Sequence, residues 1–329
     1  MIRKLMLGAP AMILAATLVS ATGAQAAEPA TCSANAVFGI VAHGGAMSKR
    51  VKEPGRLAIM KAALTKARAS LKAGASALDT VEIVVRTFED SGKFNTGKGA
   101  IANAAGMVET DASIMDGRDL SAGAVASMTA IKNPVHAARL VMEKTRHVLL
   151  VGDRGQAAVE KLGAQSVPPS YFINNKVKDT SGAEHGTVGA VALDRCGHIA
   201  AATSTGGFDA KIPGRVGDSP LVGDGVFADD NIAGFSATGH GEFFIRYNIT
   251  KDVADRMAYL HESIDDAMDH DIHHKLADLN AEGALIGIDK AGNIAMQWNS
   301  AGLYRGYATN SEAPIVAVYE GPTQNKRAQ

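Results

Sequence analysis

Hydroxyl-bearing residues gather at one end of a predicted β-hairpin, where they could carry nucleophilic chemistry. Thr187 opens a short apolar run, and a second run ends in Thr203-Ser204-Thr205-Gly206-Gly207. Asp194-Arg195-Cys196-Gly197 between the two runs is typical of a tight turn, so the hairpin brings Thr187 and Thr205 to the same end. The glycines there let a ligand approach the backbone closely. Taken alone, Thr187 is equally an ordinary β-forming residue at the start of a core strand.

A second group of residues indicates recognition of a small zwitterion. Arg215 and Asp218 stand three positions apart in the glycine-rich segment from Lys211 to Gly225. A guanidinium binds both oxygens of a carboxylate, and an aspartate pairs with an ammonium group. An isolated pair of this kind is more often a surface ion pair.

These motifs together resemble the plant-type asparaginases, also called isoaspartyl peptidases, which are N-terminal nucleophile (Ntn) hydrolases. The resemblance is carried by three segments: Gly186-Thr187-Val188-Gly189, Arg215-Val216-Gly217-Asp218 and Thr238-Gly239-His240-Gly241-Glu242. Enzymes of that family cut their own chain before the threonine of the first motif. The resemblance therefore implies autocleavage between Gly186 and Thr187. It also implies hydrolysis of the asparagine side-chain amide and of β-aspartyl dipeptides, with release of aspartate.

The family's mechanism assigns roles to the matching residues. A threonine hydroxyl is a weak nucleophile without a nearby base, and a freed α-amine titrates near neutrality, so Thr187 would supply both groups. Thr205 would support the nucleophile's hydroxyl, while Thr238 and Gly239 would hold the oxyanion. The expected substrate-binding residues are Asn95, Arg215, Val216, Gly217, Asp218, Thr238, Gly239, His240 and Gly241.

Two departures and three alternatives remain open at the level of sequence. Met47 follows His43-Gly44-Gly45-Ala46 where the family has glycine, and His240 stands where the family has threonine. Either departure would suit an inactive relative that never matures. Glycosylasparaginases share the nucleophile but have Asp-Thr-Ile-Gly in place of residues 186–189. A periplasmic amino-acid-binding protein without turnover would use Arg215 and Asp218 equally well.

The loop from Phe88 to Phe94 resembles the family's sodium-binding loop. Such a loop binds through backbone carbonyls, so the resemblance implies a structural sodium ion near Phe88, Glu89, Ser91 and Phe94. The proposed covalent chemistry requires no cofactor.

Composition and the N-terminus bound the class of protein and its location. The chain has 329 residues, a formal charge of −1 and 46% hydrophobic residues. This composition is sufficient for a globular core, and the sequence contains no basic stripe that would indicate binding to nucleic acid. Arg3 and Lys4, an apolar run to about Val19 and Ala24-Gln25-Ala26 are typical of a signal peptide over residues 1–26. A periplasmic or secreted protein is expected, and no later segment is long and apolar enough to span a bilayer.

Export would permit a disulfide between Cys32 and Cys196. Both cysteines are expected at the end of the sheet away from Thr187, which favours pairing, although two separate thiols fit the sequence equally well.

Alternating strand and helix patterns indicate an α/β protein. The resemblance implies a four-layer αββα sandwich of the Ntn-hydrolase type. It divides the chain into an α-subunit at 27–186, with an exposed, mobile linker at about 165–186, and a β-subunit at 187–329. Both would form one catalytic domain, and the family assembles as an (αβ)2 heterotetramer. The patterns also predict helices at 54–72 and 77–90, and one continuous helix from Glu242 to about Leu260.

Overall fold

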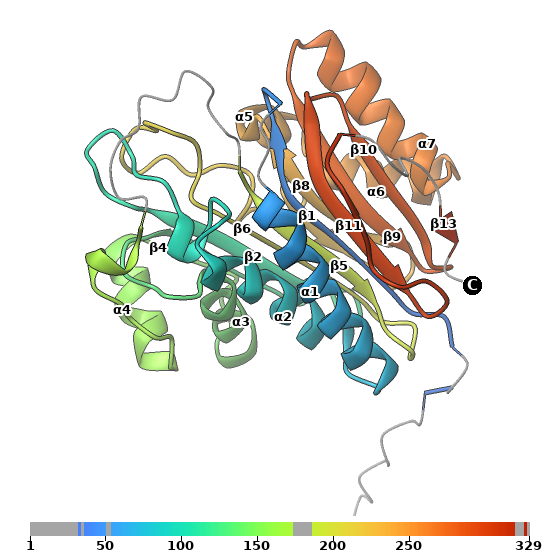
Figure 1. Ribbon diagram of the computed structural model, residues 1–329, viewed down its shortest axis with the longest axis horizontal. Helices are drawn as coiled ribbons and strands as arrows, with labels where there is room; N and C mark the ends of the chain where they lie inside the picture. The colour runs from blue at the N-terminus through green and yellow to red at the C-terminus, as the bar shows by residue number, and fades with distance from the viewer. Residues whose placement is uncertain (1–31, 34–35, 51–53, 174–185, 320–325, 328–329) are drawn as a thin grey trace, which may run out of the picture. The chain divides into compact units, whose positions relative to one another are not determined.

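Two β-sheets lie face to face between layers of helices in the computed structural model (Figure 1). The structure describes residues 32–33, 36–50, 54–173, 186–319 and 326–327. The predicted signal peptide at 1–26 and residues 174–185 of the predicted linker lie outside these ranges. The order helix, sheet, sheet, helix confirms the predicted αββα sandwich.

The larger sheet contains the predicted hairpin at its centre. Among the described residues it has eight strands in the order β12-β11-β1-β5-β6-β2-β3-β4. The side chains of β5 and β6 are buried on both faces, which explains why these strands lack polar alternation. The strand bounds are β1 Gly39–Met47, β2 Thr110–Asp116, β3 Ala122–Met128, β4 Leu149–Val151, β5 Val188–Leu193, β6 Ile199–Thr205, β11 Gly302–Thr309 and β12 Ile315–Ala317.

The smaller sheet covers the inner face of the larger one. Within the described ranges it has five strands in the order β13-β10-β9-β8-β7, and β8 and β9 pack against β1, β5 and β6. Apolar side chains such as Val41, Val191, Ile286 and Ile288 fill the space between the sheets. The strand bounds are β7 Val226–Ala228, β8 Ala233–Gly239, β9 Gly283–Asp289, β10 Asn293–Trp298 and β13 Lys326–Arg327.

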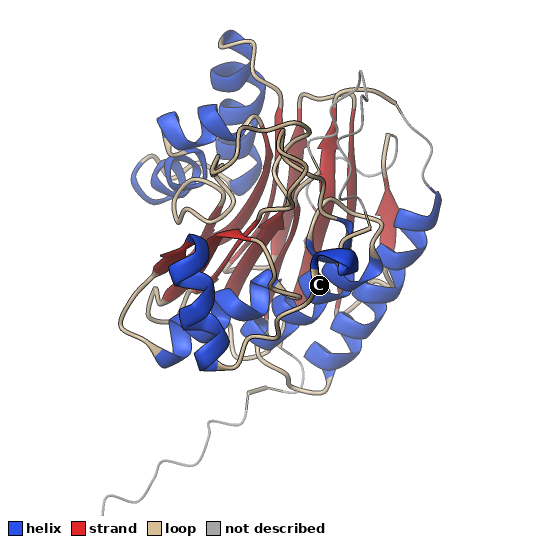
Figure 2. Cartoon of the chain, turned by 90° about the vertical axis from the view of Figure 1, so that its left-hand side faces the viewer, coloured by secondary structure: helices blue, strands red, loops and turns tan. Residues whose placement is uncertain are grey.

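Helices form the two outer layers (Figure 2). Helices α1, α2 and α3 cover the larger sheet, and α6 and α7 cover the smaller one. No helix within the described ranges is long and apolar enough to cross a lipid bilayer. The helix bounds are α1 Pro54–Lys72, α2 Ala77–Ser91, α3 Pro134–Lys144, α4 Gly152–Leu162, α5 Gly241–Tyr247, α6 Ile249–Tyr259 and α7 Ile264–Asp269, with short turns at Gly97–Gly99, Pro169–Tyr171 and His270–Leu276.

Helix α2 shows how local sequence sets these elements. The hydroxyl of Ser76 accepts the backbone N–H of Asp79 at 3.1 Å and caps the first turn. Gly92 ends the helix with a left-handed φ of 67°. The predicted apolar stripe is fully buried against the sheet; its members are Leu78, Val81, Val84, Val85 and Phe88.

Three elements differ from the sequence patterns. Strand β1 continues through His43-Gly44-Gly45-Ala46, where the pattern indicates a loop, and its register shifts between His43 and Ala46. The helix predicted from Glu242 to Leu260 is broken at Asn248, which adopts a left-handed φ of 48° between α5 and α6. The segment from Val226 to Gly239 forms β7 and β8, which local patterning does not indicate.

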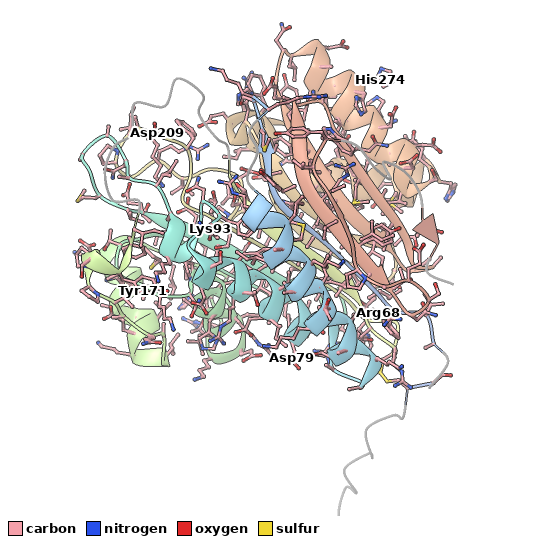
Figure 3. All side chains as sticks on the ribbon, viewed as in Figure 1. Arg68, Asp79, Lys93, Tyr171, Asp209 and His274 are labelled. Carbon is pink, nitrogen blue, oxygen red and sulfur yellow. A yellow bond between two sulfur atoms is a disulfide. The ribbon has the colours of Figure 1, made fainter. Side chains whose placement is uncertain are left out.

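Cys32 and Cys196 are joined by a disulfide, with their Cα atoms 4.9 Å apart (Figure 3). Cys32 precedes β1, and Cys196 lies in the turn between β5 and β6. The bond therefore links a part of the chain before Gly186 to a part after it. The larger sheet also joins these two parts of the chain, because β1, which precedes Gly186, pairs with β5, which follows it.

A buried carboxylate on α2 ties this helix to α3. Glu82 accepts hydrogen bonds from His136 Nδ1 and Arg139 Nη1, each at 2.8 Å. Arg139 also pairs with Asp79 at 2.6 Å. Burial raises the pKa of Glu82, but its hydrogen bonds and the nearby charges of His136 and Arg139 outweigh burial and bring the pKa down to about 2.

We expect Glu82→Gln to lower the free energy of unfolding by about 2–3 kcal/mol at neutral pH, since one pKa unit corresponds to about 1.4 kcal/mol. The folded pKa lies below the unfolded value of 4.5, so this stability is present above pH 4.5 and is lost as the pH falls toward 2. Denaturant unfolding of both proteins between pH 7 and pH 3 measures it. A difference that stays constant over this range would contradict the assignment.

Candidate active site

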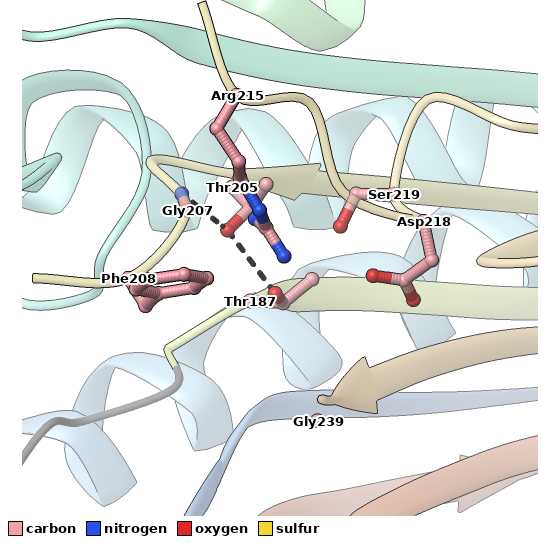
Figure 4. A pocket seen from close by; sticks show the side chains of 8 residues that line it. All are labelled: Thr187, Thr205, Gly207, Phe208, Arg215, Asp218, Ser219 and Gly239. Atoms are coloured by element: carbon pink, nitrogen blue, oxygen red, sulfur yellow. Dashed lines mark hydrogen bonds between the residues drawn. The ribbon is translucent and has the colours of Figure 1, made fainter. Parts of the chain in front are cut away.

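The register of the central hairpin places the two threonines together. Val188 of β5 pairs with Ser204 of β6, so Thr187 and Thr205 are neighbours at one end of the sheet. The hydroxyl of Thr187 donates a hydrogen bond to Thr205 Oγ1 at 3.1 Å. The backbone N–H of Gly207 also donates to Thr205 Oγ1, at 3.0 Å (Figure 4). Thr205 thus holds the Thr187 hydroxyl in one orientation.

These threonines open onto a small pocket. Arg215, Asp218 and Gly239 come from two other segments of the chain and complete it (Figure 4). The lining residues are Thr187, Thr205, Gly207, Phe208, Arg215, Asp218, Ser219 and Gly239. The structure therefore brings the hydroxyl pair, the cation and the carboxylate of the sequence analysis into one space.

Arg215 is held on three sides. Its Nε donates to Glu242 Oε1 at 3.0 Å, and its guanidinium carbon lies 4.4 Å from the centre of the Phe208 ring. A Cβ at Gly217 would lie 2.7 Å from Arg215 Nη1, so glycine is needed at that position. Burial raises the pKa of Glu242, but the hydrogen bond and charge of Arg215 outweigh it, and the pKa is lowered. The arrangement orients the guanidinium while its side chain remains 16% exposed.

Asp218 is a buried carboxylate with free hydrogen-bonding capacity. Its residue is 5% exposed, and Oδ2 has no hydrogen-bond partner among the described residues. Burial raises the pKa of Asp218 to about 7, against the opposing charge of Arg215. A buried acceptor without a partner is costly, and an ammonium group in the pocket would satisfy it.

The end of β8 brings Gly239 to the pocket from the smaller sheet, and the buried Thr238 precedes it on the same strand. The backbone N–H of Ala46 on β1 donates to Thr238 Oγ1 at 3.3 Å. Because that oxygen accepts from Ala46, the hydroxyl proton of Thr238 is available to a developing negative charge.

Asn95 lies behind the hydroxyl pair rather than in the pocket lining. Its Nδ2 donates to the carbonyl of Gly207 at 2.6 Å, and its Oδ1 accepts the N–H of Ile101 at 3.0 Å. A Cβ at Gly186 would lie 2.7 Å from the Asn95 Cβ. Asn95 therefore packs against the residue before Thr187 and fixes the loop after Thr205.

The other sequence-predicted binding residues surround the pocket. A Cβ at Gly241 would lie 2.6 Å from Asp218 Oδ1, so this glycine lets the carboxylate pass. Val216 lines a neighbouring cavity together with Met107 and Phe172. His240 is half-buried, and its Nδ1 accepts the N–H of Glu282 at 3.1 Å.

Met47, the other departure from the family pattern, is 2% exposed and packs in the apolar layer beneath the helices. Neither Met47 nor His240 lies among the pocket-lining residues.

The loop after α2 has the donors for a hard cation. The carbonyl of Glu89 would lie 2.7 Å from a Cβ at Gly97, and those of Phe94 and Gly92 would lie 2.3 and 3.0 Å from one at Gly99. Gly97 and Gly99 thus leave space beside these backbone oxygens that a side chain would fill. Oxygen donors of this kind suit sodium, which would hold the loop and take no part in the chemistry.

A cluster of two carboxylates and one histidine that could hold a metal ion lies on the helices that cover the smaller sheet. Asp252, His270 and Asp271 place one ligand atom each within 4.8 Å of one another. Lys275 already pairs with Asp252 and, at 2.7 Å, with Asp271. The ammonium supplies the positive charge that these carboxylates need, so we assign no metal to this cluster.

Phe208 and Ser219 line the pocket but carry no signal in the sequence. Phe208 merely follows Gly206-Gly207, and its contact with Arg215 depends on how the loop folds back. Ser219 follows Asp218, and its carbonyl accepts the hydroxyl of Ser113 at 2.5 Å.

Comparison of the sequence with known proteins shows the family of the chain. The family described as Asparaginase matches residues 36–180 and 174–318. An isoaspartyl peptidase of Salmonella typhimurium is 42% identical over 269 residues, which cover 76% of this chain and 86% of that protein. An isoaspartyl peptidase/L-asparaginase of Mus musculus is 40% identical over 298 residues, covering 84% and 90% of the two chains. The corresponding protein of Homo sapiens is 39% identical over 285 residues, covering 80% and 91%. These matches confirm the resemblance found in the sequence, and the chain belongs to the asparaginase family.

Proposed function

We propose that this protein is a threonine hydrolase that cuts its own chain between Gly186 and Thr187. The mature enzyme then hydrolyses asparagine and β-aspartyl dipeptides to release aspartate. The observation that carries the proposal is the pocket in which the Thr187 hydroxyl, supported by Thr205 at 3.1 Å, faces Arg215 and Asp218. The family membership and the names of the relatives support the same activity.

The pocket orients an aspartyl group by its two charges. Arg215 binds the α-carboxylate and the ionised Asp218 binds the α-ammonium, which presents the side-chain carbonyl to Thr187. These two contacts favour an aspartyl group that carries a free α-carboxylate and a free α-ammonium. A residue inside an ordinary peptide chain has neither charge and would bind less well.

Catalysis proceeds through an ester. Thr187 Oγ bonds to the carbonyl carbon while its proton passes to the α-amine of Thr187, and Thr238 and Gly239 stabilise the oxyanion. The carbon–nitrogen bond then breaks, and the leaving amine takes the proton. Water attacks the ester by the same route, which frees aspartate and restores the Thr187 hydroxyl.

We further propose a periplasmic or secreted location, following removal of residues 1–26, and assembly as (αβ)2. A sodium ion held by the backbone of Phe88, Glu89, Ser91 and Phe94 would stabilise the loop that leads to Asn95. The resemblance of this loop to the family's sodium-binding loop supports the sodium proposal.

The deciding experiment combines N-terminal sequencing of purified protein with activity assays. We expect one sequence to begin at Thr187, and turnover of asparagine and β-aspartyl dipeptides. Glycosylasparagine as the preferred substrate would favour the glycosylasparaginase type, and binding of amino acids without turnover would favour a binding protein. Full activity in a chain that remains uncut would refute the proposal.

The disulfide gives a second check on scission. Because Cys32 precedes the cut and Cys196 follows it, we expect mature protein to run as one band without reductant and as two bands with it. The control is the Cys196→Ser variant, which should give two bands under both conditions. One band from reduced, active wild-type protein would contradict the proposed cut.

We expect Phe208→Leu to raise KM about three- to tenfold with a smaller change in kcat. The ring face that steadies the Arg215 guanidinium is lost, and such contacts contribute about 0.5–2 kcal/mol. Steady-state kinetics on asparagine measures the change, and Phe208→Tyr, which keeps the ring, is the matched control. An unchanged KM in Phe208→Leu would rule out this role.

A further inference from the structure

His43 is a buried imidazole that lies between the two sheets close to the nucleophile. It is fully buried on β1, where it pairs with Gly189, two residues after Thr187. A Cβ at Gly189 would lie 2.6 Å from His43 Nε2 and 1.9 Å from the hydroxyl of Ser236. The glycine of the scission motif therefore leaves the space in which these two side chains meet.

A chain of three hydrogen bonds runs from this ring. His43 Nε2 lies 2.9 Å from Ser236 Oγ, which lies 2.7 Å from Thr203 Oγ1. The Thr203 hydroxyl donates to the carbonyl of Gly225 at 2.9 Å. All three side chains are fully buried, so the chain is shielded from water.

The direction of the chain follows from its last member. The Gly225 carbonyl can only accept, and it takes the single hydroxyl proton of Thr203. Ser236 must then donate to Thr203, which leaves the Ser236 oxygen to accept from His43. His43 therefore carries its proton on Nε2. Burial lowers the pKa of His43 to about 3, with the backbone of Thr187 opposing in part, so the ring is neutral and holds that one proton.

The three side chains connect β1 with the two strands, β6 and β8, that carry Thr205 and the proposed oxyanion donors. Thr203 lies two residues before Thr205 on β6, and Ser236 lies two residues before Thr238 on β8, so each pair shares one strand face. The Gly225 carbonyl also accepts the N–H of Ala237. This hydrogen bond links the end of the segment from Lys211 to Gly225, which carries Arg215 and Asp218, to β8.

We propose that His43, Ser236 and Thr203 are positioning residues that set the distance between the Thr187–Thr205 pair and the oxyanion donors on β8. None of them lines the pocket, and they act only through Thr205, Thr238 and Gly225. The nucleophile and the oxyanion donors come from different sheets, so the spacing of the sheets decides whether both reach the same carbonyl group. Displacements of about 1 Å in such geometry can cost about a hundredfold in rate. This inference rests on the proposed function.

The test compares Thr203→Val with Thr203→Ser in the full chain. Valine keeps the shape and removes the hydroxyl, while serine keeps the hydroxyl. For Thr203→Val we expect kcat per cut chain to fall about ten- to a hundredfold, KM to stay within about threefold, and scission to slow. Thr203→Ser should retain most of the wild-type kcat.

Thr110→Val is the matched control, because Thr110 is also fully buried in the larger sheet and donates to a backbone carbonyl, that of Met128, at 3.1 Å. It should leave kcat and scission near wild type. Adding Ser236→Ala to Thr203→Val should cost little more, since both changes break one chain of hydrogen bonds.

A wild-type kcat in Thr203→Val, or a rise in KM alone, would overturn the positioning role while leaving the proposed function intact. Wild-type protein that is neither cut nor active would instead overturn the proposed function. Nitrogen NMR of labelled wild-type protein, with His43→Gln to assign the signal, tests the direction independently of any folding defect. We expect the Nε2–H tautomer, and an Nδ1–H signal for His43 would overturn the inference.

Discussion

Thr187→Ala is expected to leave the chain uncut and without hydrolytic activity. The variant loses the hydroxyl that Thr205 orients at 3.1 Å, and in the proposed mechanism this hydroxyl is the attacking group both in scission and in turnover. Loss of a nucleophile lowers kcat by at least about three orders of magnitude. Intact mass measures scission, and ammonia release from asparagine measures turnover.

The matched control is Thr187→Ser, which keeps a hydroxyl at the same place and should be cut and active at a reduced rate. Unfolding of Thr187→Ala should resemble that of uncut wild-type protein, because only one buried methyl and one hydroxyl are lost. If Thr187→Ala were still cleaved after Gly186, or still released ammonia, the nucleophile would have to be another residue.

Asp218→Asn is expected to lower kcat/KM by about a hundred- to a thousandfold. The buried carboxylate has an oxygen without a partner among the described residues, and the amide cannot supply the charge that an α-ammonium group requires. Truncating one member of a buried charge pair typically costs 2–5 kcal/mol, or about thirty- to five-thousandfold, and the expected loss lies within this range. Glu242→Gln is a useful comparison, because that carboxylate is 54% exposed and should cost less than about tenfold.

The dependence of KM on pH should identify Asp218 directly. Burial raises its pKa to about 7, the Arg215 charge opposes this, and the carboxylates of Asp224 and Glu242 add to it. Only the ionised carboxylate binds an ammonium group well, so KM for asparagine should fall as the pH rises from 6 to 8. In Asp218→Asn this fall should be absent. Titration of the Thr187 amine falls in the same range, but it acts on kcat as the base in the chemical step. A KM independent of pH in the wild-type enzyme would argue against the carboxylate as the ammonium site.

The parts of the site that follow from the sequence are those set by short-range structure. Thr187 and Thr205 come together because one hairpin turn fixes the register of two strands. Arg215 and Asp218 lie in one loop, so their proximity needs only that the loop folds on itself. The family resemblance adds Thr238 and Gly239, whose approach from the smaller sheet no local pattern indicates.

The parts that the sequence does not predict depend on contacts between distant elements. Phe208 reaches Arg215 only after the loop folds back, and Ser236 meets His43 across the space between the sheets. Strand β7 is only three residues long and is followed by Asp229-Asp230-Asn231, and β8 contains two glycines, so local pattern favours turns here. In the structure they are buried against β5 and β6, and tertiary packing overrides local preference.

The disulfide has a consequence for recovery after denaturation. Once the backbone is severed beside Thr187, reassembly of the larger sheet would be a reaction between two molecules, with a yield that rises with protein concentration. The disulfide would keep both fragments on one covalent body, so pairing of β1 with β5 would stay first order at any dilution. With the proposed export and scission, the cut chain would therefore rebuild this sheet in dilute surroundings for as long as the disulfide stays oxidised.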